Sequence, residues 1–346
     1  MIAGLDDLLA LTGQPGLPEL RASMAELLGE PEAQGRVVVE QRLNRSGSVN
    51  RVRFEVQGAL VSVVAKCSRP APAQRNKFVV RRCLPAVGLE SGAPAILATA
   101  PERGGRCVWQ IYEDLGDRTL ETDRDPEAVR AAVQLLGEVH ARFVRHPLLA
   151  EVRHRGGEFG RRFYSSSVQD AIACLEALAH RHLDWPSDGI APTERLLERL
   201  RALQAEDRQR TEVIADLGGP ETFLHGDMWL KNVAVAARGA RVRLIDWDHA
   251  GVGPAGYDLS TFVNGFSPEE RDGVLELYGE AVAAAGWQLP SREEMDYLFS
   301  TFELGRLANC VIWPALDAIE GVEGALEELE MACDWFGSLD AALPTS

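Results

Sequence analysis

Two short stretches of the sequence place oxygen-bearing side chains between apolar runs. In FLHGDMWLKNVAV, residues 223–235, the polar residues His225, Asp227 and Asn232 interrupt what would otherwise be two strand-like segments. A later apolar run, in LIDWDHAGVGP, ends in Asp246 and Asp248. Because buried polar groups are costly without partners, we expect these side chains in loops at the ends of the strands.

A β-hairpin from residue 233 to residue 245 would bring Asn232 and Asp246 to the same end. One amide oxygen and one carboxylate suit a hard cation such as Mg²⁺, which keeps waters and takes further ligands from phosphates. Asp227 would then serve to accept a proton. Phosphoryl transfer requires these groups, because the protein mainly positions the nucleophile and neutralises charge. The alternative is that Asp227 and Asn232 only form turns, as Asp and Asn commonly do.

The elements that must position these groups fall into two regions. Alternating apolar residues and short turns such as NRSGS and QGA predict an antiparallel sheet of five strands and one helix before residue 115. The expected strands are 37–43, 51–56, 60–65, 95–98 and 107–112, and the helix is 74–84. Apolar residues at helical spacing dominate afterwards, and Asp125 and Pro126 form a helix start. The expected helices there include 166–182, 193–215, 268–285 and 292–336, with short β runs at 223–224, 233–236 and 242–245.

The predicted fold class is therefore α+β with two lobes. Residues 1–114 would form a β-rich N-terminal lobe and residues 115–346 a mostly helical C-terminal lobe, joined by a hinge near 113–116.

The motifs LHGDMWLKN and LIDWDHAGVGPAGYDL resemble those of the aminoglycoside phosphotransferase and choline-kinase-like family, small-molecule relatives of the protein kinases. The resemblance runs from about residue 43 to residue 259 and implies a two-lobed protein-kinase-like fold. It implies that Asp227 is the catalytic base and that Asn232 and Asp246 hold Mg²⁺. It further implies that His225 and Asp258 brace the catalytic loop.

In the N-terminal lobe, LNRSGSVNRVRFEV resembles a glycine-rich nucleotide loop, with Ser46, Gly47 and Ser48 beside the phosphates. A plain hairpin turn explains these residues equally well. Lys66, at the end of the third strand, resembles the lysine that reaches the α- and β-phosphates. In CVWQIYEDLGD, the resemblance places adenine contacts at Tyr112 and Asp114, which implies ATP, or GTP, as the nucleotide.

One departure from the family concerns the partner of Lys66. The helix that follows carries Lys77, Arg81 and Arg82 but no glutamate, and Glu90 lies in the loop beyond it. Either Glu90 reaches the lysine, or the lysine is held differently, or the enzyme is slow. The missing glutamate also favours a second class of function, a nucleotide-binding regulator without transfer activity, although Asp227 and its partners count against it. A third class is transfer of a nucleotidyl group or phosphorylation of protein.

The composition narrows the partners. A formal net charge of −16, from 52 acidic and 36 basic residues, argues against a nucleic-acid partner and would suit a cationic ligand, although an acidic surface also simply favours solubility. No apolar run approaches the roughly 20 residues of a membrane helix, and the first residues lack a secretory signal, so we expect a cytoplasmic protein with no membrane partner. The six cysteines form no C-x-x-C pair, and there is no G-x-S-x-G or H-E-x-x-H motif.

The sequence thus predicts an ATP- and Mg²⁺-dependent O-phosphotransferase acting on a small hydroxylated molecule. The family resemblance favours an aminoglycoside or another hydroxylated antibiotic, with choline-like amino alcohols, amino-sugars, nucleosides and biosynthetic intermediates as alternatives. Asp248 is expected to contact the metal or a cationic substrate, or else to be a solvated loop carboxylate. Trp313 is expected to form an apolar wall of the acceptor site, with acidic linings from the C-terminal helices. The candidate acids are Glu294, Asp296, Glu303 and Asp317. The alternative is that most of these residues are ordinary helix surface.

Overall fold

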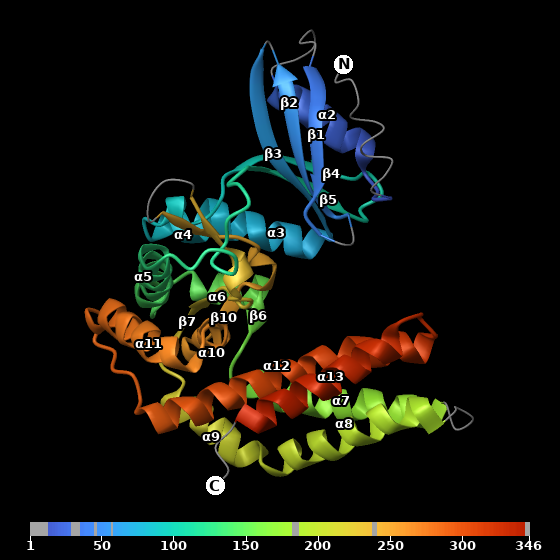
Figure 1. The fold of residues 1–346 in the computed structure, drawn as a ribbon, viewed down its shortest axis with the longest axis vertical. Coiled ribbons are helices and arrows are strands. Elements are labelled where there is room, and N and C mark those ends of the chain that lie inside the picture. Colours follow the sequence, from blue (N-terminus) through green and yellow to red (C-terminus); the bar gives the residue numbers. More distant parts are fainter. Residues whose placement is uncertain are drawn as a thin grey trace. The chain divides into compact units, whose positions relative to one another are not determined.

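The computed structural model describes residues 13–28, 35–44, 47–56, 58–181, 187–236 and 241–342 (Figure 1). The chain divides into two compact units. Unit 1 comprises Met1–Val139 and Trp229–Ala250, and unit 2 comprises His140–Met228 and Gly251–Ser346.

Unit 1 is built on a five-stranded sheet in the order β1-β2-β3-β5-β4, with every neighbouring pair antiparallel. The strands are β1 (Gly35–Arg42), β2 (Val49–Val56), β3 (Ala59–Ser68), β4 (Ile96–Pro101) and β5 (Val108–Glu113). Alternate side chains such as Phe54 and Ala65 point into a buried core that includes Trp109, because successive residues of a strand face opposite sides of the sheet. The predicted antiparallel sheet is confirmed.

Two helical segments accompany this sheet. After β3 the chain enters α3 (Pro70–Phe78), continues through a π-helical turn, Val79–Cys83, and ends in α4 (Leu84–Ala86). Pro70 suits the first turn, where its missing N–H has no partner to lose. The observed helical segment therefore extends beyond both ends of the helix predicted at 74–84. The helix α2 (Leu17–Leu27), which adds to the one helix predicted, packs its Leu20 and Met24 into the sheet's core.

A hairpin from the middle of the sequence belongs to unit 1. It consists of β8 (Val233–Val235) and β9 (Val242–Leu244), preceded by a 3₁₀ turn, Leu230–Asn232, and followed by another, Trp247–His249. Ala234 pairs with Thr119, and α3 packs against the turn at Trp247–His249. These contacts tie the hairpin to α3 and to Thr119, so unit 1 includes the hairpin as well as the residues up to Val139. The predicted division into lobes of residues 1–114 and 115–346 stays a prediction.

Unit 2 is mostly helical and carries a small sheet in the order β6-β10-β7. Its strands are β6 (Gly157–Glu158), β7 (Glu221–Leu224) and β10 (Gly251–Pro254). The last turn of α5 (Pro126–Phe143) also lies in unit 2. The other helices are α6 (Leu149–Arg155), α7 (Arg161–Arg181), α8 (Ser187–Ala205), α9 (Asp207–Leu217), α10 (Gly256–Asn264), α11 (Pro268–Ala283), α12 (Arg292–Glu320) and α13 (Ala325–Ala342). In Figure 1, α7, α8, α12 and α13 run side by side as long helices, and α12 packs against both α7 and α13.

Two predicted helices are each broken in two. The segment 193–215 contains a break at Glu206, between α8 and α9, and the segment 292–336 is interrupted after α12. At the second break Gly321 adopts a left-handed backbone with φ of 78°, a common way for a helix to end. None of the described helices is long and apolar enough to cross a membrane.

Candidate active site

The end of the β8–β9 hairpin brings two predicted metal ligands onto one structural element. Val233 pairs with Leu244, and the amide of Ile245 donates to the carbonyl oxygen of Asn232 at 2.9 Å, so Asn232 lies beside the start of the segment that carries Asp246. The predicted hairpin is confirmed. An amide oxygen and a carboxylate at one hairpin end fit the oxygen ligands that Mg²⁺ prefers. Their role as metal ligands stays a prediction.

The backbone at Asp246 is unusual. Its φ of 65° is left-handed, a conformation that Asp and Asn tolerate better than most side chains. This turn directs the chain from β9 into the 3₁₀ turn at Trp247–His249.

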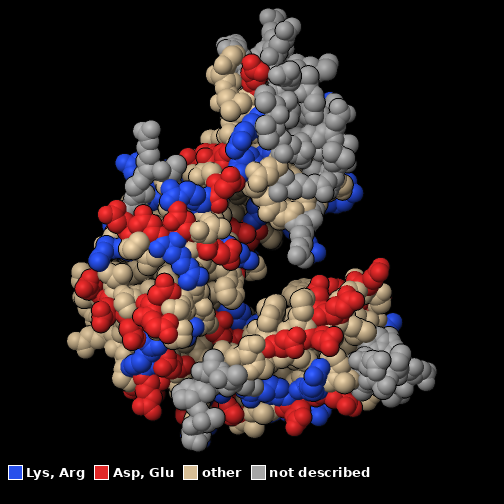
Figure 2. Space-filling view, viewed as in Figure 1, with Lys and Arg blue, Asp and Glu red and all other residues tan. Residues whose placement is uncertain are grey.

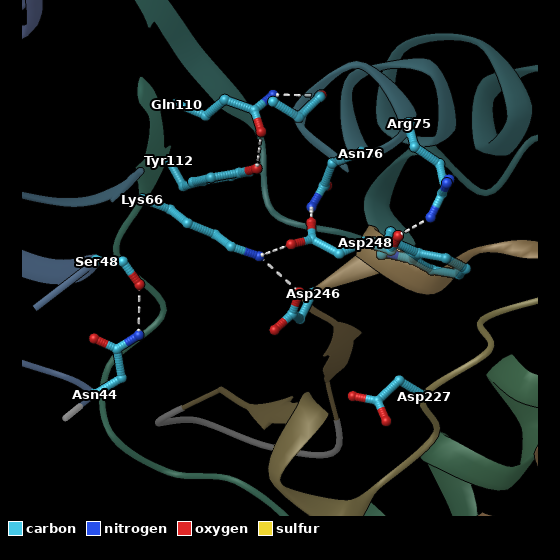
Figure 3. Close-up of polar contacts among 12 residues, drawn as sticks. Asn44, Ser48, Lys66, Arg75, Asn76, Gln110, Tyr112, Asp227, Asp246 and Asp248 are labelled. Carbon is cyan, nitrogen blue, oxygen red and sulfur yellow. Dashed lines mark hydrogen bonds and ion pairs between the residues drawn. The ribbon is translucent and has the colours of Figure 1, made fainter. Parts of the chain in front are cut away.

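Lys66 lies close to the C-terminal end of β3 and forms two ion pairs (Figure 3). Its Nζ is 2.7 Å from Oδ1 of Asp246 and 2.7 Å from Oδ2 of Asp248. Burial by itself would lower the pKa of Lys66, but the attraction of the two carboxylates raises it. The ammonium group therefore stays charged at neutral pH, and its contact with phosphates stays a prediction.

The helix α3 contributes an asparagine where the family resemblance led us to expect a glutamate. Nδ2 of Asn76 donates to Oδ1 of Asp248 at 2.9 Å, and Arg75 donates to the backbone carbonyl of Asp248. The lysine is thus held differently from the family pattern. Asp248 is its partner, and α3 acts by orienting that partner. Glu90, the other candidate, is exposed on a 3₁₀ turn, Glu90–Gly92.

The side chain of Asp248 is 18% exposed, which disfavours the alternative of a solvated loop carboxylate. One of its oxygens pairs with Lys66 and the other accepts from Asn76. A contact of Asp248 with the metal or with a cationic substrate stays a prediction. Sequence reasoning missed Asn76, because a single polar residue on a helix carries no local signal of a partner far along the chain.

The loop between β1 and β2 is organised by Asn44, which sequence reasoning also missed. Nδ2 of Asn44 donates to Oγ of Ser48 at 2.8 Å, and its Oδ1 accepts from the amide of Val49 at 3.1 Å. Gly47 has a φ of 68°, which favours glycine at that position. Ser46 lies outside the described residues. The nucleotide-binding role of this loop stays a prediction.

The two residues predicted at the adenine site have side chains that already form hydrogen bonds or ion pairs within unit 1. Tyr112 is buried and donates its hydroxyl to Oε1 of Gln110 at 2.9 Å. Asp114 accepts from Oγ of Ser62 at 2.5 Å and pairs with Arg51 at 2.9 Å. Burial alone would raise the pKa of Asp114, but the Ser62 hydrogen bond and the Arg51 charge lower it. Any contact of these residues with adenine would therefore come from their backbone groups, and the adenine site itself stays a prediction.

In unit 2 the loop that carries Asp227 is fastened to the first turn of α10. The fully buried carboxylate of Asp258 accepts from the amide of His225 at 2.6 Å and from the amide of Gly226 at 2.9 Å. Nδ1 of His225 in turn accepts from the amide of Asp227 at 3.3 Å. These contacts fasten the loop to α10, and the bracing roles of His225 and Asp258 in catalysis stay predictions.

Asp258 has a further neighbour in His140, a residue of α5. The imidazole is buried, with Nδ1 2.7 Å from the hydroxyl of Tyr278 and Nε2 3.4 Å from Oδ2 of Asp258. Although burial alone would raise the pKa of Asp258, the hydrogen bonds from His140 and the Gly226 amide keep it lowered. Asp258 is thus ionised and serves as an acceptor for the loop.

The predicted acceptor-site residues on α12 differ in their surroundings. Trp313 is 64% exposed. Glu294 caps the start of α12 through Ser291, and Glu303 is buried and accepts from Ser260. These two acids therefore have structural partners within unit 2.

Three features define the class of small-molecule kinases related to protein kinases. A lysine on a strand of the sheet pairs with two aspartates, a hairpin later in the chain carries Asn and Asp at one end, and a fastened loop carries a further carboxylate. The chain belongs to the phosphotransferase enzyme family, which matches residues 40–295. The predicted family and the predicted enzyme class, a small-molecule kinase that transfers phosphate to a hydroxyl, are confirmed. No curated protein matches this chain.

Solved structures share the fold. A spectinomycin phosphotransferase in complex with ADP and spectinomycin is 13% identical, with a TM-score of 0.58 over 91% of this chain and 93% of its own. A choline kinase from Cryptosporidium parvum Iowa II is 12% identical, with a TM-score of 0.57 over 89% of this chain and 90% of its own. An aminoglycoside-3'-phosphotransferase of type VIII is 18% identical, with a TM-score of 0.50 over 83% and 99%. The predicted α+β kinase-like fold is confirmed.

Proposed function

We propose that this chain transfers the γ-phosphoryl group of ATP to a hydroxyl group of a small molecule. The observation that carries the proposal is the pairing of Lys66 with Asp246 and Asp248, because it places a positively charged lysine beside a carboxylate suited to a metal. Complexes of related folds with ADP or AMP support an adenine nucleotide rather than the guanine alternative.

In this mechanism the residues of the chain mainly orient the acceptor hydroxyl and neutralise the charge of the phosphates. Asp227 orients the acceptor hydroxyl and takes its proton as the oxygen attacks the γ-phosphorus. Lys66 exchanges part of its aspartate pairing for the phosphate oxygens and offsets their charge. Asn232 and Asp246 would hold Mg²⁺, which when bound neutralises charge on the phosphates.

For the acceptor we propose an aminoglycoside or another hydroxylated antibiotic, bound by unit 2. A second candidate is a choline-like amino alcohol, which the similarity of fold to choline and ethanolamine kinases favours. Exposed Trp313 would supply an apolar contact for either.

The test is a transfer assay on the purified chain with ATP, Mg²⁺ and a panel containing spectinomycin, aminoglycosides, choline and ethanolamine, followed by mass spectrometry. An acceptor heavier by one phosphate supports the proposal. An acceptor carrying AMP would replace it with nucleotidyl transfer, and ATP binding without any product would replace it with a regulatory role.

A companion variant isolates the base. Asp227→Asn is expected to lower kcat by at least about 100-fold, since general-base catalysis contributes roughly 10²–10⁴-fold. ATP binding, measured by calorimetry, should stay unchanged, because Asp227 is proposed to contact the acceptor. Full turnover by Asp227→Asn would show that another group accepts the proton.

A further inference from the structure

The loop that carries Asp227 is held on two sides by opposite charges. Asp258 accepts from the loop's amides, as described above. On the other side, Nη1 of Arg306 in α12 donates to the carbonyl oxygen of Gly226 at 3.3 Å. An anion therefore holds the loop's donors and a cation holds its acceptor, immediately before Asp227.

Arg306 is itself firmly oriented. Nη1 also donates to the hydroxyl of Tyr257 at 2.8 Å, and Nη2 donates to the backbone carbonyl of Tyr257 at 3.2 Å. The guanidinium carbon lies 4.1 Å from the centre of the Tyr257 ring, and Nε lies 3.6 Å from Oε1 of Glu303. The planar guanidinium suits this site because it stacks on an aromatic ring while donating in several fixed directions.

Glu303 completes the attachment between α12 and α10. Its Oε1 accepts from the hydroxyls of Ser260 at 2.8 Å and Thr261 at 3.2 Å, which follow Asp258 in α10. Asp258, which accepts from the loop's amides, belongs to α10, and Arg306, which donates to the loop's carbonyl, is itself bound to Tyr257 of α10. Both contacts with the loop therefore depend on α10. The loop, α10 and α12 therefore form one network of buried polar groups.

A charge with so little exposure needs compensation. The side chain of Arg306 is 12% exposed, and isolated buried charges are strongly unfavourable. Although burial lowers the pKa of Arg306, the negative groups around it, Asp227 among them, raise it. Asp227 directly follows Gly226, whose carbonyl oxygen Arg306 contacts, so the carboxylate and the guanidinium attract each other within the same compact unit.

We propose that Arg306 is a positioning residue for Asp227. It holds the carbonyl of Gly226, whose φ of 81° forms the turn that presents Asp227, and its charge attracts the carboxylate into place. This inference rests on the proposed function. Arg306 lies beyond the segment that matches the family, residues 40–295.

The test compares Arg306→Met with Arg210→Met. Arg210, in α9, is a matched control because its side chain is 6% exposed, pairs with Glu206 and stacks on Tyr297 at 5.2 Å. Arg306→Met should lower kcat on the order of 100-fold, the cost of a small misplacement of a catalytic group, with KM for ATP unchanged. Arg210→Met should keep the wild-type kcat even where it lowers the melting temperature. Arg306→Lys keeps the cation and should give an intermediate kcat.

A second measurement does not depend on turnover. Hydrogen exchange of the amides of His225 and Gly226 should be faster in Arg306→Met and in Arg306→Lys than in the wild type, and unchanged in Arg210→Met. Wild-type kcat together with unchanged exchange in Arg306→Lys would overturn the proposal, as would an equal loss of kcat in Arg210→Met. If the wild type itself transfers no phosphate, the proposed function fails, whereas the exchange result still decides whether Arg306 holds the loop.

Discussion

At the scale of residues, the clearest feature is a series of contacts in which Asn76 donates to Asp248 and Asp248 pairs with Lys66. The sequence-based question of how the lysine is held without a helix glutamate has a physical answer. A carboxylate from the segment after β9 takes the place of the glutamate, and the helix supplies a neutral donor that orients it.

This chain of contacts predicts the effect of two substitutions. Asp248→Asn removes one of the two charges that hold Lys66, and Asn76→Ala removes the donor that orients Asp248. Because a hydrogen bond to a charged group contributes about 1.5–3 kcal/mol, we expect Asp248→Asn to lower kcat/KM for ATP by about 10- to 100-fold. Asn76→Ala should have a smaller effect in the same direction. Steady-state kinetics at varied ATP measures both.

The control for these variants is Lys77→Ala, which changes an exposed residue on the same helix and should leave kcat/KM unchanged. If Asp248→Asn behaved like Lys77→Ala, the ion pair with Asp248 would not contribute to nucleotide use.

The sequence predicted the grouping of Asn232 with Asp246, because both flank a hairpin and the pairing of adjacent strands is a local property. It did not predict Asn76 or Arg306. Each makes its contact with a residue distant in the chain, Asp248 and Gly226 respectively, and single polar side chains have no periodic pattern that reveals such a contact.

At the scale of elements, the junction between α12 and α13 depends on backbone conformation alone. A Cβ at Gly321 would meet no atom within 4 Å, so only its left-handed φ of 78° opposes a side chain. Gly321→Ala should therefore destabilise the fold by about 1–2 kcal/mol.

Gly337, inside α13, is the matched control for this prediction. A Cβ there also meets nothing within 4 Å, but the residue is helical. Gly337→Ala should stabilise the fold by about 0.5–1 kcal/mol, because alanine favours the helix more than glycine does. Thermal unfolding should show shifts of opposite sign, and shifts of the same sign would contradict the assignment of Gly321 as the helix terminator.

Most elements were predicted in kind, because apolar periodicity is a strong signal over long segments. The breaks at Glu206 and Gly321 were missed, since apolar spacing continues across them. The short elements α10 and β10 were missed as well, because four to nine residues are too few to show a period.

At the scale of the whole molecule, pH should reveal the contribution of Asp258 to stability. Its pKa is lower in the folded chain than the roughly 3.9 of an unfolded aspartate, so its contribution is present above that pH and is lost as pH falls through the folded value. Asp258→Asn should be markedly less stable than the wild type at pH 7, because its amide cannot accept from both loop amides. The difference should shrink below about pH 4.

Denaturant unfolding at pH 7, 5 and 3.5 would measure this difference. Asp272→Asn is the control, because Asp272 is an exposed carboxylate whose ion pair with Arg292 should contribute about 1 kcal/mol or less. A constant difference between wild type and Asp258→Asn across the pH range would contradict the lowered pKa.

The sequence indicated the enzyme class of this protein more clearly than its acceptor substrate. Two motifs resembled those of a small-molecule kinase family, and this resemblance implied the kinase-like fold. The charge of −16 carried little further information about the ligand. On the face drawn in Figure 2, acidic side chains are spread over the helices and interspersed with basic ones.

Both carboxylates that hold Lys66 are carried by the segment after β9, and neither by α3. Protein kinases are switched by moving a helix so that its glutamate leaves the lysine. The same displacement here would withdraw the contacts of Asn76 and Arg75 with Asp248, but it would leave both carboxylates on Lys66. We therefore expect the enzyme to be constitutively active. Its rate should depend on the concentrations of nucleotide and acceptor and should not be switched by a displacement of α3.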